Sequence, residues 1–450
     1  MDTIVAVATP PGRSAIGVVR MSGPQSVEIT RSLIRDGQFQ PEANQTVLKK
    51  LIADSGDVLD YALVSYFKAP HSFTGEDMME ISCHGSPIIL RQLLDLIQKF
   101  DGRLGGPGEF TLRACRNGKM NLSQAEGIRD VINAQTMAAA QQATRQLKGE
   151  LSTALHPCKQ MLISVIVKLE SALEFVEDDL PSVQREEMEN QLGEVLAAVT
   201  GLARTYASGH LLRDGLRVTL IGRPNVGKSS LFNRLLRFER AIVTDLPGTT
   251  RDSLTESISL QGIPISLTDT AGIREAGDRI EAIGLERTQG AIADADILIV
   301  VVDASSNLSA EDLAALSQAS EATHIVALNK SDLCTTLRLE SELVDHAKVV
   351  HVSALTGEGL EDLTAAILEP FGTVDSEGLG LLITDSRHHD LLKRTQASLV
   401  EGMELMREDA GEELVLVGLH NALRFLGEIT GETTTEDILA EIFSSFCIGK

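Results

Sequence analysis

The stretch "RVTLIGRPNVGKSSLFNRLLR", residues 217–237, decides the fold of the central part of this chain. A short apolar run is followed by a glycine-rich turn and then by apolar residues at helical spacing, which predicts strand, loop and helix. Within it, "GRPNVGKSS" fits the pattern G-x-x-x-x-G-K-S. Such a loop wraps its backbone amides around phosphate groups, its lysine adds a cation, and its serine hydroxyl suits Mg2+. We therefore expect a phosphate-binding loop between a strand and a helix.

Apolar strands alternate with helical stretches over residues 213–372. The runs "RVTLIG", "ISLTDTAG", "ILIVVVDA" and "HIVALNK" are strand-like. Strands that alternate with helices form a parallel sheet that has helices on both faces. The central region is therefore predicted to be a doubly wound, mostly parallel α/β domain.

The rest of the chain separates into helical sequence and a smaller mixed region. Helical sequence flanks the central region at 118–212 and 373–450, which predicts one helical domain split by an inserted domain. Ser123 and Glu126 have the spacing of a capping box at its first helix, and the acidic stretch "EDDLPSVQREE" is expected to be a loop. Residues 1–117 mix strands with turns and predict a small α+β domain. The whole chain is thus expected to be a multidomain α/β protein.

The composition excludes several classes of protein. Hydrophobic residues make up 43% of the chain, which is enough for folded cores. The formal net charge is -24, so if RNA is the substrate, a partner or a small basic patch must grip its phosphates. The longest aliphatic run, Ile297 to Val302, is far shorter than the roughly 20 residues of a membrane span, so we expect no membrane segment. Scattered cysteines without a C-x-x-C pair fit a reducing cytoplasm.

Three further motifs follow the phosphate loop in order. "DTAG" (269–272) lies at a strand end, where its carboxylate can hold Mg2+ through water and its glycine amide can face the γ-phosphate. "NKSD" (329–332) ends in a carboxylate that can accept two hydrogen bonds from guanine, whereas adenine offers neither donor there. "SAL" (353–355) can support the base from behind. Together these signals resemble the Ras-like GTPase superfamily, which implies GTP as the ligand.

Hydrolysis of GTP needs an unusual group in this sequence. Many small GTPases orient the attacking water with a glutamine after the DTAG glycine, but this chain has Ile273 there. A monovalent cation held by Asn225 would neutralise transition-state charge instead. Glu275, Glu281 and Glu286 are equal candidates, on spacing alone, for positioning the water.

The stretch "DLPGTTRD" corresponds to the first switch of GTPases, which supplies a threonine to Mg2+. Thr250 is favoured for this role by resemblance, with Thr249 next to it. The nucleotide-binding residues expected from all of these motifs are Asn225, Val226, Gly227, Lys228, Ser229, Ser230, Thr244, Asp245, Leu246, Pro247, Gly248, Thr249, Thr250, Asp269, Thr270, Ala271, Gly272, Asn329, Lys330, Ser331, Asp332, Ser353, Ala354 and Leu355.

The sequence resembles the MnmE (TrmE) family of tRNA-modification GTPases almost from end to end. The stretches that carry the resemblance are "DTIVAVATPPGRSAIGVVRMSG", "SFTGEDMMEISCHG", "GPGEFTLRACRNGKMNLSQAEGIRDVI", "GRPNVGKSS", "TDLPGTTRD", "DTAGIREAGDRIEAIGLER" and "IFSSFCIGK". The phosphate loop is shared by many proteins, whereas the N-terminal stretches and the tail are much more specific.

The resemblance implies a particular activity. The family's N-terminal domain dimerises and binds a tetrahydrofolate derivative, in the 5,10-methylene or 5-formyl form. A homodimer and a FAD-dependent partner, MnmG (GidA), form a heterotetramer. Together they attach an aminomethyl or carboxymethylaminomethyl group to carbon 5 of the wobble uridine of certain tRNAs. The partner is then expected to make much of the contact with tRNA, which accounts for the acidic charge of this chain.

The resemblance also implies roles for single residues. Potassium-contacting positions correspond to Asn225, Thr244, Leu246 and Thr249, magnesium-contacting positions to Ser229 and Thr250, and the catalytic acid to Glu281. Folate-contacting positions correspond to Arg20, Glu80 and Lys119.

The chain departs from the family pattern at four positions in the N-terminal part. These are Leu112, Cys115 and Arg116, where glutamate, phenylalanine and leucine are more usual, and Cys83, where the family has a small or polar residue. The folate cleft is therefore expected to differ in detail. Cys83 and His84 are adjacent in sequence and are not expected to act as a nucleophile and base.

The tail "IFSSFCIGK" is the remaining feature. Cys447 is four residues from the end, as prenylation requires, but Gly449 and the charged Lys450 do not suit that modification. The apolar "EIFSSF" predicts a helix that packs back onto the protein. By resemblance its last residues lie near the folate, with Lys450 a candidate ligand group and Cys447 a candidate reactive thiol.

A GTPase switch in ribosome assembly is the alternative function. Such proteins share the three nucleotide motifs, but they usually append a basic RNA-binding module. This chain has an acidic helical region and the "FCIGK" tail instead, which favours the tRNA-modifying activity.

Overall fold

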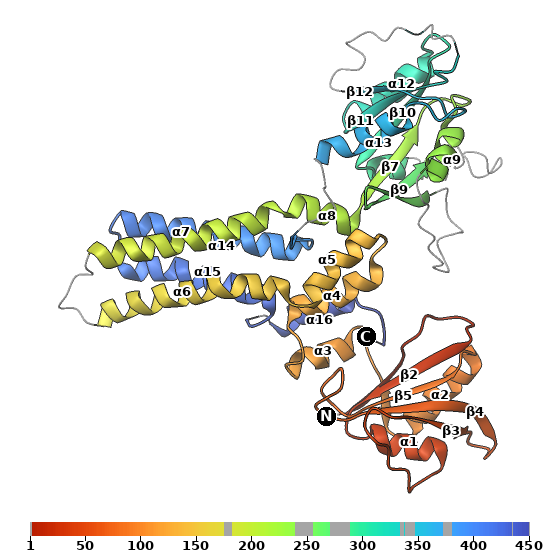
Figure 1. Cartoon of the computed structure of the whole chain (residues 1–450), viewed down its shortest axis with the longest axis vertical. Coiled ribbons are helices and arrows are strands. Elements are labelled where there is room, and N and C mark those ends of the chain that lie inside the picture. Colours follow the sequence, from red (N-terminus) through yellow and green to blue (C-terminus); the bar gives the residue numbers. More distant parts are fainter. Residues whose placement is uncertain are drawn as a thin grey trace. The chain divides into compact units, whose positions relative to one another are not determined.

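The computed structural model describes residues 2–174, 182–238, 255–270, 289–333, 337, 347–371, 380–433 and 435–449 (Figure 1). The chain divides into two compact units. The first comprises Met1–Arg129, Gln146–Gln160 and His420–Lys450, and the second comprises Asp130–Arg145 and Met161–Leu419. The multidomain α/β class expected from the sequence is confirmed.

A six-stranded sheet forms the centre of the first unit. Its strand order is β3-β4-β5-β2-β1-β6, and every pair is antiparallel except β1 with β6. The strands are β1 (Thr3–Val7), β2 (Ile16–Ser22), β3 (Thr46–Ile52), β4 (Val58–Phe67), β5 (Met78–His84) and β6 (Gly102–Leu104). Helices α1 (Ser26–Ile34) and α2 (Pro87–Lys99) cover one face.

Alternation along the strands separates the face beneath α1 and α2 from the opposite, more open face, where a small apolar cluster around Phe110 covers Ile4, Ala6 and Met78. Val19 and Ile81 are fully buried in the core beneath the two helices. Their neighbours Arg20 and Glu80 point the other way, because successive side chains of a strand alternate between faces. The register pairs Arg20 with Glu80 directly across β2 and β5. Short strands with one buried face therefore display these two charged residues on the opposite face.

Helices make up the remainder of the first unit and continue into the second. They are α3 (Glu109–Arg116), α4 (Leu122–Asn133), α5 (Met137–Leu147), α6 (Glu150–Glu174), α15 (Glu412–Thr430) and α16 (Glu436–Ser444). Leu122 and Ala125 of α4 pack on Phe443 and Phe446 in one apolar cluster. The predicted C-terminal helix therefore exists and packs back onto the protein, as expected.

The predicted capping box at Ser123 and Glu126 is wrong by two residues. The Asn121 side chain accepts a hydrogen bond from the Gln124 backbone amide at 2.9 Å, and the Gln124 side chain accepts one from the Asn121 amide at 3.0 Å. Helix α4 begins at Leu122, so Ser123 and Glu126 are already inside it, where both are buried. An asparagine caps a helix as well as a serine does. Because Leu122 is buried as the first residue of the helix, the cap is Asn121 rather than Ser123.

The second unit contains long helices and the inserted sheet domain. The helices α7 (Ser182–Arg204) and α14 (Ser386–Arg407) lie side by side, and α8 (Tyr206–Asp214) leads into the sheet (Figure 1). The stretch "SVQREE", expected to belong to a loop, is the first part of α7. None of the helices in the described ranges is long and apolar enough to cross a membrane.

The sheet of the second unit has the order β12-β11-β10-β7-β9-β8, and only β8 at the edge is antiparallel. The strands are β7 (Leu216–Ile221), β8 (Thr255–Leu260), β9 (Ile263–Asp269), β10 (Ile297–Asp303), β11 (His324–Asn329) and β12 (Lys348–His351). Helices α9 (Lys228–Phe238) and α13 (Leu360–Leu368) pack on one face and α12 (Ala310–Ala319) on the other, followed by the short helix η2 (Glu369–Phe371). This is the predicted doubly wound domain. The nucleotide motifs follow the carboxyl ends of β7, β9 and β11, where such sheets bind ligands.

Candidate functional site

The phosphate loop depends on two glycines that admit close backbone approach. Gly222 has φ +143°, and a Cβ there would lie 2.4 Å from the Val301 carbonyl oxygen. Gly227 has φ +98°, and a Cβ there would lie 2.3 Å from Asn329 Nδ2. Any other residue at these positions would be strained and would clash. The loop can therefore pack tightly against the neighbouring strands β10 and β11 only with glycine at both places.

Lys228 is held at the mouth of this loop. Its Nζ donates hydrogen bonds to the carbonyl oxygens of Gly222 and Arg223, both at 2.9 Å, and the residue is 6% exposed. Ser229 and Ser230 follow in the first turn of α9 and are exposed, as is Asn225 with φ +63°. The amino end of a helix beside a lysine attracts phosphate. The exposed Ser229 hydroxyl and Asn225 side-chain amide oxygen are ligand types that Mg2+ and K+ accept.

The guanine motif is tied to the phosphate loop. Asn329 Nδ2 donates to the Val226 carbonyl oxygen at 2.8 Å, and Asn329 Oδ1 accepts from the Ala354 amide at 3.0 Å. Ser353 Oγ donates to Asp332 Oδ1 at 2.5 Å. "NKSD" and "SAL" are therefore brought together, as the sequence analysis expects. The Asp332 carboxylate is oriented by the Ser353 hydroxyl.

Some of the other residues predicted for this site are buried or hydrogen-bonded, some are exposed, and the rest lie outside the described residues. Asp269 is buried at the end of β9, and the Thr270 hydroxyl donates to the Leu220 carbonyl oxygen at 2.8 Å. Lys330 has φ +68°, whereas Ser331 donates its amide to the Val352 carbonyl oxygen. Leu355 is 79% exposed. Outside the described residues lie Thr244, Asp245, Leu246, Pro247, Gly248, Thr249, Thr250, Ala271, Gly272, Ile273, Glu275, Glu281 and Glu286.

Two of the predicted folate-contacting residues bind one another on the open face of the first sheet. Arg20 Nη2 and Nε lie 2.7 and 2.8 Å from Glu80 Oε1. Arg20 Nη1 also donates to the Gly449 carbonyl oxygen at 3.3 Å. Lys119 does not join this pair, because its Nζ donates to the Pro70 carbonyl oxygen at 2.9 Å. The structure thus brings Arg20, Glu80 and the C-terminal tail together, whereas Lys119 lies against the loop before β5.

The tail itself is held by its backbone. Ile448 forms an antiparallel bridge with Pro107, and the Gly108 amide donates to the Cys447 carbonyl oxygen at 3.3 Å. Gly449 has φ +97°, and a Cβ there would lie 2.5 Å from the Val7 carbonyl oxygen at the end of β1. The side chain of Cys447 is exposed. The exposed thiol therefore comes two residues before the glycine whose carbonyl oxygen binds Arg20, and Lys450 lies outside the described residues.

The cysteines that depart from the family pattern are inert in their surroundings. Burial raises the pKa of the Cys83 thiol to about 11, and Cys83 Sγ donates to the Gly17 carbonyl oxygen at 3.6 Å. His84 binds Asp60 instead, with Nδ1 2.7 Å from Oδ1. Burial also raises the pKa of the Cys115 thiol to about 12. The expectation that Cys83 and His84 do not form a catalytic pair agrees with this geometry.

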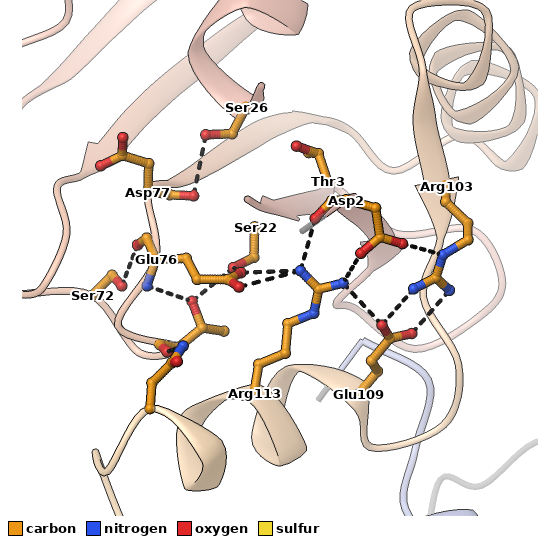
Figure 2. A network of polar contacts seen from close by, with 12 residues as sticks. Asp2, Thr3, Ser22, Ser26, Ser72, Glu76, Asp77, Arg103, Glu109 and Arg113 are labelled. Atoms are coloured by element: carbon orange, nitrogen blue, oxygen red, sulfur yellow. Dashed lines mark hydrogen bonds and ion pairs between the residues drawn. The ribbon is translucent and has the colours of Figure 1, made fainter. Parts of the chain in front are cut away.

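A network around Arg113 was not anticipated from the sequence (Figure 2). Its guanidinium binds Asp2 Oδ1 at 2.6 Å, Glu109 Oε1 at 3.1 Å and Glu76 Oε2 at 3.2 Å. Arg103 binds Asp2 and Glu109 at 2.6 Å each. These side chains line a cavity of about 310 Å³, which Leu112 and Arg116 also line. The i,i+4 spacing of Glu109 and Arg113 is the only signal for this network in the sequence. Through Asp2, the network holds the residues before β1 against α3.

The comparisons with known proteins cover the whole chain. The family model described as "GTP-binding protein TrmE N-terminus" matches residues 3–119, and the model described as "MnmE helical domain" matches residues 122–447. The tRNA modification GTPase MnmE of Aquifex aeolicus (strain VF5) is 42% identical over 450 residues, which are 100% of both chains. The protein of the same name from Koribacter versatilis (strain Ellin345) is 43% identical over 100% of this chain and 99% of its own.

One solved structure that is similar to this chain matches its central part. The G domain of the T. maritima FeoB iron transporter is 30% identical over 34% of this chain and 97% of its own, with a TM-score of 0.26. The family assignment rests instead on the full-length relatives, which confirm the resemblance seen in the sequence. GTP hydrolysis in tRNA modification, as predicted, is likewise confirmed. This chain belongs to the MnmE family of tRNA modification GTPases.

Proposed function

We propose that this GTPase depends on K+ and works with the FAD-dependent protein MnmG (GidA) in a heterotetramer. Together they attach an aminomethyl or carboxymethylaminomethyl group to carbon 5 of the wobble uridine of certain tRNAs, in the cytoplasm. The observation that carries the proposal is the meeting of the tail with the Arg20–Glu80 pair. The guanidinium and the carboxylate lie on the same face of one sheet, and the tail that binds the guanidinium carries an exposed thiol. A GTPase that acted only as a switch would not need this second polar site.

The residues of the phosphate loop support the GTPase part of the proposal. Lys228 and the first turn of α9 would bind the phosphates of GTP, and Asp332 would read guanine. Ser229 and Thr250 would hold Mg2+, and Asn225, Thr244, Leu246 and Thr249 would hold K+. Glu281 would position the attacking water.

The polar pair and tail support the folate part. A folate has carboxylates that an arginine or lysine can bind and a pterin ring whose donors suit a carboxylate. Arg20, Lys119 and Lys450 are proposed for the first role and Glu80 for the second. When bound, the folate would supply the one-carbon unit, and Mg2+ and K+ would offset the negative charge on the phosphates. Cys447 would act at the folate end of this cleft.

Exposed apolar residues on the open face of the sheet support a homodimer. Leu48 and Leu63 face each other across β3 and β4 and are 64% and 48% exposed, and Tyr61 beside them is 51% exposed. Large exposed apolar groups on one sheet face mark an interaction surface. We propose that a second copy covers them and thereby also borders the folate site. The domains proposed are 1–117 for folate binding and dimerisation, 118–212 with 373–450 for the helical domain, and 213–372 for the GTPase domain.

Nucleoside analysis of tRNA tests the proposal. In cells that lack this chain, the modified wobble uridines should disappear, and the wild-type gene should restore them. Cys447→Ser should leave GTP hydrolysis unchanged but fail to restore the modification. Ser444→Ala, an exposed substitution on the same tail, is the matched control and should restore it. Unchanged wobble uridines in the deletion strain would rule out the proposed function, and normal modification with Cys447→Ser would assign the thiol to packing.

A further inference from the structure

The segment from the last residue of β10 to the first turn of α12 contacts both nucleotide-binding loops. At its start, Asp303 Oδ2 accepts a hydrogen bond from Lys330 Nζ of the guanine motif at 2.5 Å. At its end, both carboxylate oxygens of Asp312 accept from Arg223 Nε of the phosphate loop, at 3.1 and 2.9 Å. Neither acidic residue belongs to a nucleotide-binding motif. One connecting segment therefore joins side chains from the two loops that hold the nucleotide.

In the Arg223–Asp312 pair, the carboxylate is buried and the guanidinium is partly exposed. The Asp312 side chain is 1% exposed and the Arg223 side chain 24% exposed. Arg223 Nη2 also donates to Ser306 Oγ at 2.9 Å, so the guanidinium is fixed at two points of the same segment. A carboxylate this deeply buried requires a charged partner and hydrogen bonds, since desolvation of an unpaired charge costs several kcal/mol. The geometry of Arg223 is therefore strongly determined.

Arg223 in turn shapes the part of the loop that meets phosphate. Its carbonyl oxygen accepts one of the hydrogen bonds from Lys228 Nζ, at 2.9 Å. It also comes two residues before Asn225, whose backbone takes the left-handed conformation. A shift of Arg223 would move the carbonyl group that holds the lysine and would change the direction of Asn225. Asp312 on α12 thus acts on the phosphate site through Arg223.

We propose that Asp312 is a positioning residue for GTP: through Arg223 it holds the phosphate loop in the shape that binds the nucleotide. Asp312 has a second task, because its carboxylate also accepts from the Ser309 amide and hydroxyl, at 3.0 and 2.8 Å, and so caps α12. The sequence alone suggests only this capping role. The experiment must therefore separate capping from positioning.

Four variants of the full chain make this separation. Arg223→Gln removes the cation and leaves a buried charge unpaired, so it should lower both Tm and nucleotide affinity. Asp312→Asn removes that charge, so the double variant should recover much of the Tm. Its affinity should not recover: the Kd for fluorescently labelled GDP should stay raised about ten-fold, a loss of about 1.4 kcal/mol. Arg223→Lys, which keeps a cation, should regain part of the affinity.

Two neighbouring substitutions serve as controls. Ser309→Ala removes the cap of α12 and leaves the Arg223–Asp312 contact, so it should lower Tm with little change in the Kd. Glu311→Gln removes an exposed charge from the same turn and should change neither quantity. The preference for GDP over ADP should persist in every variant, because Asp332 is untouched.

The outcomes distinguish the two roles. Raised Kd in the double variant at near-normal Tm, with normal Kd for Ser309→Ala, supports positioning. Affinity that recovers together with Tm in the double variant would show that the pair is only structural and would overturn the proposal. An equal rise of Kd for Glu311→Gln and Asp312→Asn would show that loss of any negative charge in this turn weakens binding. That result would also overturn the proposal.

Discussion

Substitution of Gly449 by alanine should uncouple tRNA modification from GTP hydrolysis. The new Cβ would lie 2.5 Å from the Val7 carbonyl oxygen and 3.3 Å from the Ala8 Cα atom. These are backbone atoms at the end of a buried strand, so they cannot give way as a flexible side chain can. The φ of +97° adds about 1–2 kcal/mol of strain for any residue with a Cβ. The tail, rather than the sheet, must therefore move.

The magnitude follows from what the tail loses when it moves. The charge-assisted hydrogen bond from Arg20 to the Gly449 carbonyl oxygen contributes about 1.5–3 kcal/mol. Relief of the clash and strain offsets that loss, so the displaced tail is the stable state. Because Phe443 and Phe446 remain in their apolar cluster, the rest of the fold should persist and Tm should change little.

The assay compares three readouts on one preparation. GTP hydrolysis should stay within about two-fold of wild type, the rate of Cys447 alkylation should rise, and modified wobble uridine should fall at least ten-fold, which corresponds to about 1.4 kcal/mol. Gly411→Ala is the matched control, since Gly411 has φ +93° but no atoms within 4 Å of the added Cβ. It carries the same strain without the clash, far along the chain from the tail. Normal tRNA modification by Gly449→Ala would refute the reasoning.

The remaining predictions concern hydrolysis and stability. GTP hydrolysis should be several-fold faster in K+ than in Na+, because Asn225 stands at the phosphate loop and Ile273 replaces the water-orienting glutamine; equal rates in the two salts would rule out the cation mechanism. Glu281→Ala should abolish hydrolysis and keep GTP binding, as measured by single-turnover kinetics and equilibrium titration. Burial opposes ionisation of Asp385, but the charges of His388 and Arg213 outweigh it and hold the pKa of Asp385 well below its usual range. The ionised group therefore stabilises the fold fully above about pH 4 and progressively less as the pH falls below that value. Asp385→Asn should lower the free energy of unfolding by about 3 kcal/mol at pH 7, and urea titrations should show the deficit shrinking towards pH 3; a deficit independent of pH would contradict this.

Much of the nucleotide site could be predicted because its chemistry depends on local sequence. "GRPNVGKSS" contains its own turn, and "NKSD" follows its own strand, so each motif could be recognised without its neighbours in the fold. The contact from Asn329 to the Val226 carbonyl oxygen joins the two motifs in the structure. The antiparallel strand β8 was not anticipated, since "TESISL" is too polar to read as a buried strand and lies at the sheet edge.

The parts that could not be predicted depend on pairs distant in sequence. Arg20 and Glu80 are 60 residues apart, and Asp312 lies 89 residues after Arg223. In the sequence alone, Glu80 resembles an ordinary surface charge and Asp312 resembles a helix cap. The prediction of a capping box at Ser123 failed for a related reason: tertiary burial of Leu122 selects Asn121 as the cap instead. Local chemistry can thus be read from sequence, whereas the partner of a buried charge requires the fold.

Both sites use a glycine to join segments that are remote in sequence, but the two glycines have different neighbours. At Gly227 the missing Cβ makes room for the Asn329 side chain, which also binds Val226 and Ala354. The phosphate and guanine loops therefore share one rigid contact, and a change in either loop reaches the other. At Gly449 the missing Cβ makes room for backbone of β1, whereas Phe443 and Phe446 before it are held in a separate apolar cluster. The tail can consequently be released without unfolding, so at the proposed folate site function should be lost more easily than stability.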